Sequence, residues 1–127
     1  MSGAAELLWR HWQDGTVIEA LPESVRPQSR AEGYAIQAKL DQRTAKPLFG
    51  WKIAATAVAG QKHINVDGPL AGRILAERVV ADGATVDLSN NWMRVAEPEF
   101  CFRMARDLPP RAAYTFPLII KGERTLA

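Results

Sequence analysis

Two glutamates, Glu97 and Glu99, flank a proline and are the sharpest chemical feature of this sequence. In a strand their side chains would point to the same side, with Cα atoms about 6.5–7 Å apart. The two carboxylates could then converge on one cation, and hard oxygen ligands favour Mg²⁺, Mn²⁺ or Ca²⁺ over Zn²⁺. A solvated strand face is the alternative, since two like charges this close repel each other.

Lys52 and Asp67 are two further candidates for chemistry. Lys52 interrupts an apolar run, and a lysine among buried neighbours needs a partner and often has a function. The alternative is a lysine that faces solvent from a half-buried strand. Asp67 precedes Gly68 and Pro69, so turn chemistry alone would account for it.

The histidines and the single cysteine give weaker signals. His11 is expected on a helix surface and His63 in a loop, and neither has the spacing of a metal-ligand set. Cys101 has no base nearby in the sequence, which favours a packing role. One cysteine allows no internal disulfide and fits a reducing, cytoplasmic setting.

The composition, 47% hydrophobic and 24% charged, is that of a globular protein. The net charge of +2 comes from basic residues scattered among acidic ones, which argues against nucleic-acid binding. The N-terminus lacks a signal-peptide pattern, and no apolar run is long enough to span a bilayer. We therefore expect a cytoplasmic protein that binds neither nucleic acid nor a membrane.

The elements that must position these residues begin with two helices. Apolar spacing predicts the first helix at 3–14, capped by Ser2 and ended by Gly15. The second is expected to start near 27–29 and to run to about Ala45.

Strands follow the helices, which makes the predicted class α+β. They are predicted at 49–55, at 84–88 and, most clearly, at 95–104, where apolar side chains alternate with the two glutamates. Residues 60–73 are rich in Gly, Asp, Asn and Pro, so a loop with at most one helical turn is expected there.

Five motifs in a fixed order resemble those of one enzyme family. They are Tyr34-Ala35-Ile36-Gln37, Gly50-Trp51-Lys52-Ile53, Val66-Asp67-Gly68-Pro69-Leu70-Ala71-Gly72, Glu97-Pro98-Glu99 and Arg106-Asp107-Leu108-Pro109. Over residues 4–113 the chain resembles the 2-keto-4-pentenoate hydratases of the fumarylacetoacetate hydrolase superfamily. The resemblance implies a helical segment at 1–46, then a β-rich catalytic core from 47 to 113 with a partial mixed sheet of the fumarylacetoacetate hydrolase-like fold. The tail at 114–127 is unmatched.

The resemblance also implies an activity, the addition of water to 2-hydroxypenta-2,4-dienoate to give 4-hydroxy-2-oxopentanoate in aromatic-compound catabolism. A Mg²⁺ or Mn²⁺ ion would chelate this small-molecule substrate. Glu97 and Glu99 match two metal-ligating carboxylates, and Asp67 matches a position near the pocket. Lys52 matches an active-site lysine that would stabilise the enolate or move a proton.

The sequence departs from the family pattern at two backbone positions. Ala54 stands where the family usually has Gly, and it would be strained if that position needs a positive φ. Asn65 also stands where Gly is common, but Asn tolerates a left-handed conformation.

The end of the chain departs as well, because family members are much longer and carry a third metal carboxylate on a later strand. Glu123 is the only acid in the tail. From this we expect a truncated relative that binds Mg²⁺ no tighter than roughly millimolar and does not convert the dienoate. Uncovered apolar strand faces predict a homo-oligomer, or a monomer with exposed apolar surface. A 2-oxo-acid decarboxylase of the same superfamily and a non-catalytic remnant or interaction domain stay open as alternatives.

Overall fold

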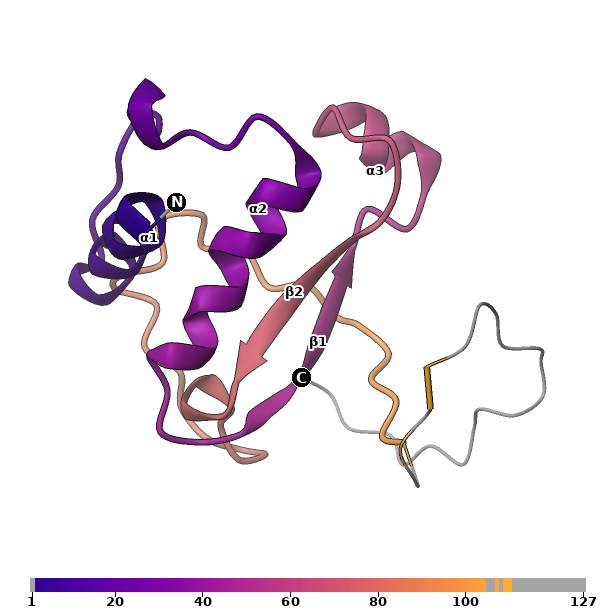
Figure 1. The fold of residues 1–127 in the computed structure, drawn as a ribbon. Coiled ribbons are helices and arrows are strands. Elements are labelled where there is room, and N and C mark those ends of the chain that lie inside the picture. The colour runs from indigo at the N-terminus through magenta and orange to yellow at the C-terminus, as the bar shows by residue number, and fades with distance from the viewer. Residues whose placement is uncertain (1, 105–106, 108, 111–127) are drawn as a thin grey trace.

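The computed structural model describes residues 2–104, 107, 109 and 110, in which helices precede and flank a small sheet. The described sheet has two antiparallel strands, β1 and β2, so the predicted mixed sheet is not seen in this part of the chain. Helix α2 lies beside β2, α1 lies on the far side of α2, and α3 lies beyond one end of the sheet (Figure 1). The predicted α+β class is confirmed.

Helix α1 spans Ser2–Asp14 and includes Ser2, which we had expected to precede it as a cap. The helix ends before Gly15, whose φ of +62° suits a glycine that stops a helix. Ala4 and Ala5 are buried and pack with Ile36 of α2. Two partly buried residues of the intervening segment complete this core, Leu21 and Val25.

Helix α2 spans Arg30–Gln37 and is capped at its start by Ser29, with a second bond made by Glu32. The Ser29 hydroxyl accepts the Glu32 N–H at 3.2 Å, and the Glu32 carboxylate accepts the Gln28 N–H at 2.7 Å. These bonds explain why the predicted start is correct to within a few residues.

The predicted continuation of this helix to Ala45 is wrong. After Gln37 the chain forms the 3-10 helix η2, Ala38–Gln42, and the helical structure ends there. The Thr44 hydroxyl contacts the N–H and the C=O of Lys46 at 3.2 and 3.3 Å, a local pattern that competes with helical bonds. Pro47 also disfavours helical geometry at Lys46.

Strand β1 spans Leu48–Ala54, as predicted, and pairs with β2, Leu70–Leu75. The loop expected at 60–73 allowed for one helical turn, and the last turn of α3, Val58–His63, lies there. The prediction is wrong at the other end, where β2 begins at Leu70. His63 therefore ends a helix instead of lying in a loop. The glycine and proline residues correctly indicated the turn between α3 and β2. Because they lie beside the apolar run of β2, that run was not predicted as a strand.

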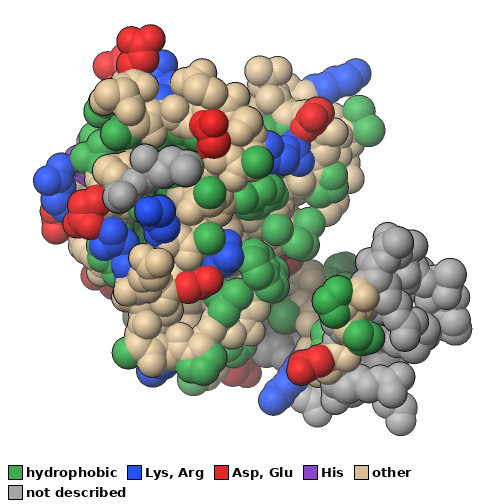
Figure 2. Space-filling model, viewed as in Figure 1, with side chains coloured by type: hydrophobic (Ala, Val, Ile, Leu, Met, Phe, Trp, Pro, Cys, Tyr) green, Lys and Arg blue, Asp and Glu red, His purple; other side chains and the backbone are tan. Residues whose placement is uncertain are grey.

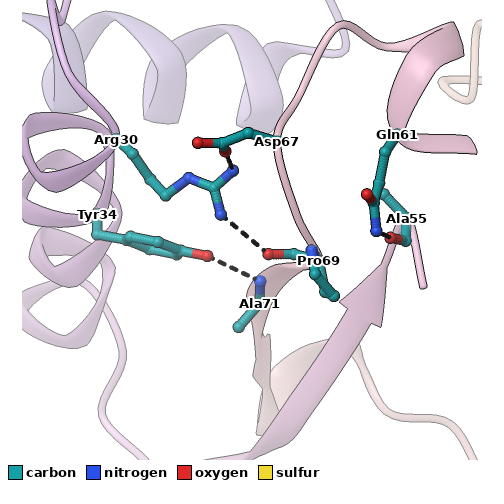
Figure 3. Close-up of polar contacts among 7 residues, drawn as sticks. All are labelled: Arg30, Tyr34, Ala55, Gln61, Asp67, Pro69 and Ala71. Atoms are coloured by element: carbon teal, nitrogen blue, oxygen red, sulfur yellow. Dashed lines mark hydrogen bonds and ion pairs between the residues drawn. The ribbon is translucent and has the colours of Figure 1, made fainter. Parts of the chain in front are cut away.

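The outer edge of β2 is protected by side chains of α2. The Tyr34 hydroxyl accepts the Ala71 N–H at 3.0 Å (Figure 3). The Gln37 amide donates to the Ala71 carbonyl at 3.0 Å. Arg73 donates to Gln37 at 2.9 Å and to Asp41 at 3.0 Å. Backbone groups that a strand edge would leave unpaired are therefore satisfied by the helix.

The strands predicted at 84–88 and 95–104 are wrong, because neither segment has regular secondary structure. A strand needs a neighbour to accept its backbone bonds, and among the described residues only β1 and β2 pair. Pro98 removes a further donor from the second segment. Cys101 is exposed, so the packing role expected for it is also wrong.

Apolar surface is exposed, as expected from the sequence. Phe100 is 90% exposed and Phe102 56% exposed on the segment that follows the glutamates. Figure 2 shows further hydrophobic side chains at the surface over the β1–β2 ribbon. No helix of the described residues is long and apolar enough to cross a membrane. The segment boundaries at 46 and 113 stay predictions, and the tail at 114–127, including Glu123, lies outside the described residues.

Two residues other than glycine near the sheet have a positive φ, and only one of them was foreseen. Asn65 has a φ of +55°, as predicted for a residue that replaces glycine. The strained alanine is Ala55, with a φ of +55°, and not Ala54, which ends β1. The Gln61 side chain of α3 donates to the Ala55 carbonyl at 2.9 Å and holds this turn (Figure 3).

Replacing Ala55 with glycine should stabilise the protein by about 0.5–1 kcal/mol. The left-handed conformation costs alanine about 1–2 kcal/mol, and glycine avoids this cost but loses more conformational entropy on folding. Urea unfolding of Ala55→Gly measures the gain. The matched control is Ala54→Gly, which should lose about 0.5–1 kcal/mol because glycine weakens a strand. Equal destabilisation by both changes would show that Ala55 is unstrained.

Candidate active site

Three of the four predicted site residues come together around Lys52, which lies in β1 opposite Gly72 of β2. The Lys52 ammonium lies 3.1 Å from Oε2 of Glu97 and also donates to Oε1 of Glu99. The lysine side chain is 40% exposed, and the carboxylate side chains are 65% and 42% exposed. Lys52 therefore has the anionic partners that its place in an apolar run required.

Both glutamates reach the same nitrogen although they do not belong to a regular strand. Their backbone is open chain with Pro98 between them, and the two carboxylates still converge on one point. The two carboxylates thus converge on the Lys52 ammonium group, and the metal site predicted for them stays a prediction.

The electrostatics of this cluster keep Lys52 charged. The hydrogen bond to Glu99 raises the pKa of Lys52 above its usual 10.5; partial burial opposes the rise and Glu97 adds to it. One ammonium faces two carboxylate groups, so with both glutamates ionised the cluster has a net charge of −1. That residual negative charge attracts a further cation.

Glu97 and Glu99 are residues that could hold a hydrated Mg²⁺ or Mn²⁺ ion, and this stays a prediction. Mg²⁺ keeps several waters and is often held by one or two carboxylates together with substrate oxygens. Glu97 and Glu99 supply two such carboxylates on one point. The described residues contain no group of three or more His, Cys, Asp or Glu side chains that could hold a metal. Further positions would therefore be filled by water, by substrate or by groups beyond the described ranges.

Asp67 contacts a different residue. Its carboxylate pairs with Arg30 at the start of α2, and Arg30 also donates to the Pro69 carbonyl at 3.2 Å (Figure 3). This contact links positions 37 residues apart, so local turn chemistry does not account for Asp67. In the described part of the chain Asp67 fastens the loop before β2 to α2, and its catalytic role stays a prediction.

A cavity of about 280 Å³ lies apart from this cluster, where α1 meets the residues that follow α2 and β2. None of the four predicted site residues lines it. Arg43, one of the lining residues, donates to Glu6 at 2.6 Å and lies over the Trp9 ring at 5.8 Å. Sequence reasoning missed this arrangement, because the contributing residues are far apart in the chain and share no motif.

The histidines take no part in the cluster. His11 contacts the Thr16 hydroxyl at 2.7 Å near the end of α1, as a helix-surface histidine can. His63 ends α3. Within the described ranges neither belongs to a group of three or more His, Cys, Asp or Glu side chains.

Curated proteins similar to this chain are hydratases. The chain is 31% identical over 108 residues to the 2-keto-4-pentenoate hydratase of Paraburkholderia xenovorans and 29% identical over 108 residues to the TodF product hydratase of Pseudomonas putida. It is 30% identical over 109 residues to the 2-keto-4-pentenoate hydratase 2 of Dechloromonas aromatica. Each alignment covers 83% of this chain.

The chain spans 40 or 41% of the length of these curated relatives. No family model matches the chain, and no solved structure matches it. The chain is thus similar in sequence to curated 2-keto-4-pentenoate hydratases, which confirms the resemblance seen in the five motifs.

The raised pKa of Lys52 predicts how its ion pairs depend on pH. A raised pKa contributes stability that is fully present below the unfolded value of about 10.5 and is lost as the pH rises through the folded value. Wild type should therefore exceed Lys52→Met in unfolding free energy by a constant amount from pH 8 to 10, no more than about 2 kcal/mol for the two exposed pairs. Urea unfolding at each pH measures the difference, which should shrink above pH 10.5. A difference that grows in that range would contradict the assigned ion pairs.

Proposed function

We propose that this chain supplies part of the site of a hydratase, an enzyme that adds water to 2-hydroxypenta-2,4-dienoate to give 4-hydroxy-2-oxopentanoate in aromatic-compound catabolism. The observation that carries the proposal is the convergence of Glu97 and Glu99 on Lys52, in a chain whose curated relatives are named hydratases. The proposal includes the fumarylacetoacetate hydrolase-like fold, a cytoplasmic location and a 2-oxo or 2-hydroxy dienoate as substrate.

Glu97 and Glu99 would hold a Mg²⁺ or Mn²⁺ ion, which polarises a 2-oxo acid as a Lewis acid when bound. The reaction adds a hydroxyl group at C4 and protons at C3 and C5, while the 2-hydroxyl group becomes a carbonyl. Negative charge therefore develops on the oxygen at C2. A lysine ammonium beside the two carboxylates can stabilise that charge or carry one of the protons.

A decarboxylase would polarise a 2-oxo acid in the same way, so Lys52, Glu97 and Glu99 fit both reactions. The hydratase is preferred because the relatives that the chain resembles are named hydratases.

Metal binding and turnover test this proposal together. Two carboxylates should bind Mn²⁺ weakly, at roughly millimolar affinity, and 2-oxopentanoate, an unreactive 2-oxo acid, should strengthen that binding by chelating the same ion. Electron paramagnetic resonance of free Mn²⁺ measures both effects. Glu99→Gln should abolish the strengthening. A 2-oxo acid that leaves Mn²⁺ binding unchanged would contradict the proposed site.

In the same preparation we expect 2-hydroxypenta-2,4-dienoate to disappear no faster than without protein, because the described residues supply only two carboxylates to hold the metal ion. The loss of dienol absorbance is the assay. Turnover that both Lys52→Ala and Glu99→Gln abolish would show that other groups complete the site in this chain. Turnover that neither change affects would point to a contaminant.

We also propose that the chain forms a homo-oligomer, on the basis of one face of β1. Phe49, Trp51 and Ile53 alternate along the strand and are 60%, 50% and 48% exposed. An uncovered apolar face of this kind favours association.

Light scattering across a tenfold concentration range should show self-association that the double change Phe49→Ser with Ile53→Ser reduces. Val86→Ser is the matched control, because Val86 is 56% exposed outside the sheet and its loss should have no effect. A wild-type protein that is monomeric at every concentration would contradict the proposed oligomer.

A further inference from the structure

We infer that Lys52 is an internal competitor of the metal ion: its ammonium group gathers Glu97 and Glu99 in the metal-free protein and leaves them when a divalent cation binds. The inference rests on the proposed function, and it concerns what this chain's own residues do before the metal arrives.

The first argument is geometric. Lys52 Nζ contacts Oε2 of Glu97 at 3.1 Å and Oε1 of Glu99, the oxygens that a shared cation would use. A Mg²⁺ ion lies about 2.0–2.1 Å from its oxygens, so an ion on Glu97 Oε2 would be no more than about 5 Å from an ammonium group that stayed in place. Two cations this close repel each other, so each weakens the binding of the other to the carboxylates.

The second argument concerns the carboxylates themselves. Glu97 and Glu99 lie in open chain, and their like charges would drive them apart. The ammonium group offsets that repulsion, so it keeps the two carboxylates close in the metal-free state. Lys52 thus arranges the ligands and also competes for them.

The third argument concerns what allows the exchange. The backbone of Lys52 is fixed by its pairing with Gly72, but its side chain is 40% exposed and has four rotatable bonds. The ammonium group can therefore turn away from the carboxylates without disturbing β1. Metal binding would release Lys52, which becomes free to face a substrate only after the metal is in place.

Mn²⁺ binding to the whole chain tests the inference, measured by calorimetry and by electron paramagnetic resonance. Lys52→Met should bind Mn²⁺ roughly two- to thirty-fold more tightly than wild type, because two exposed ion pairs no longer compete. Lys52→Arg keeps the charge and should bind no more tightly than wild type. Lys62→Met removes the same charge from α3, where Lys62 forms no ion pair among the described residues, and should change the affinity less than two-fold.

The outcomes separate the inference from the metal site. If wild type binds Mn²⁺ and Lys52→Met binds it equally or more weakly, the inference is overturned and the metal site is retained. The same holds if Lys62→Met gains as much affinity as Lys52→Met. Failure of every variant, Lys52→Met included, to bind Mn²⁺ would overturn both. Lys52→Gln, with a polar tip, repeats the measurement if circular dichroism shows that Lys52→Met is unfolded.

Discussion

Pairing between β1 and β2 fixes the position of Lys52 and joins the candidate site to the N-terminal helices. Gly72 lies opposite Lys52, and the neighbouring Ala71 and Arg73 are bonded to α2 and η2. Polar contacts matter in this molecule because the described residues have only four buried hydrophobic side chains, Ala4, Ala5, Ile36 and Leu75. So small a buried set supplies little hydrophobic stabilisation, and directional bonds must determine how the sheet and helices are arranged.

Charge balance distinguishes Asp67 from the pair Glu97 and Glu99. Asp67 is matched by one arginine, Arg30, so their pair is neutral and offers little attraction to a divalent ion. Glu97 and Glu99 share one lysine and keep a negative charge in excess. This excess charge lies on carboxylate oxygens that converge on one point. A divalent cation would therefore be attracted more strongly to the glutamate pair than to Asp67.

Local signals predicted the local structure well, whereas contacts between distant residues had to come from the fold. The start of α2 near Ser29, the apolar run of β1 and the positive φ of Asn65 could all be read from short stretches of sequence. Strand β2 could not, because its residues lie beside turn-forming glycine and proline. The alternating pattern at 95–104 indicated a strand, but no partner pairs with it in the described ranges. An anionic partner for Lys52 was foreseeable, but its identity was not, since Glu99 is 47 residues away.

Contact between Lys52 and the two glutamates in solution can be measured directly by nuclear Overhauser effects in the uniformly labelled, metal-free chain. The ε-methylene protons of Lys52 should show cross-peaks to the γ-methylene protons of both Glu97 and Glu99, because one ammonium group contacts both carboxylates. Cross-peaks between the backbone protons of Lys52 and Gly72 serve as the internal reference for an intact sheet. An intact reference without either glutamate cross-peak would contradict the convergence on which the proposed metal site depends.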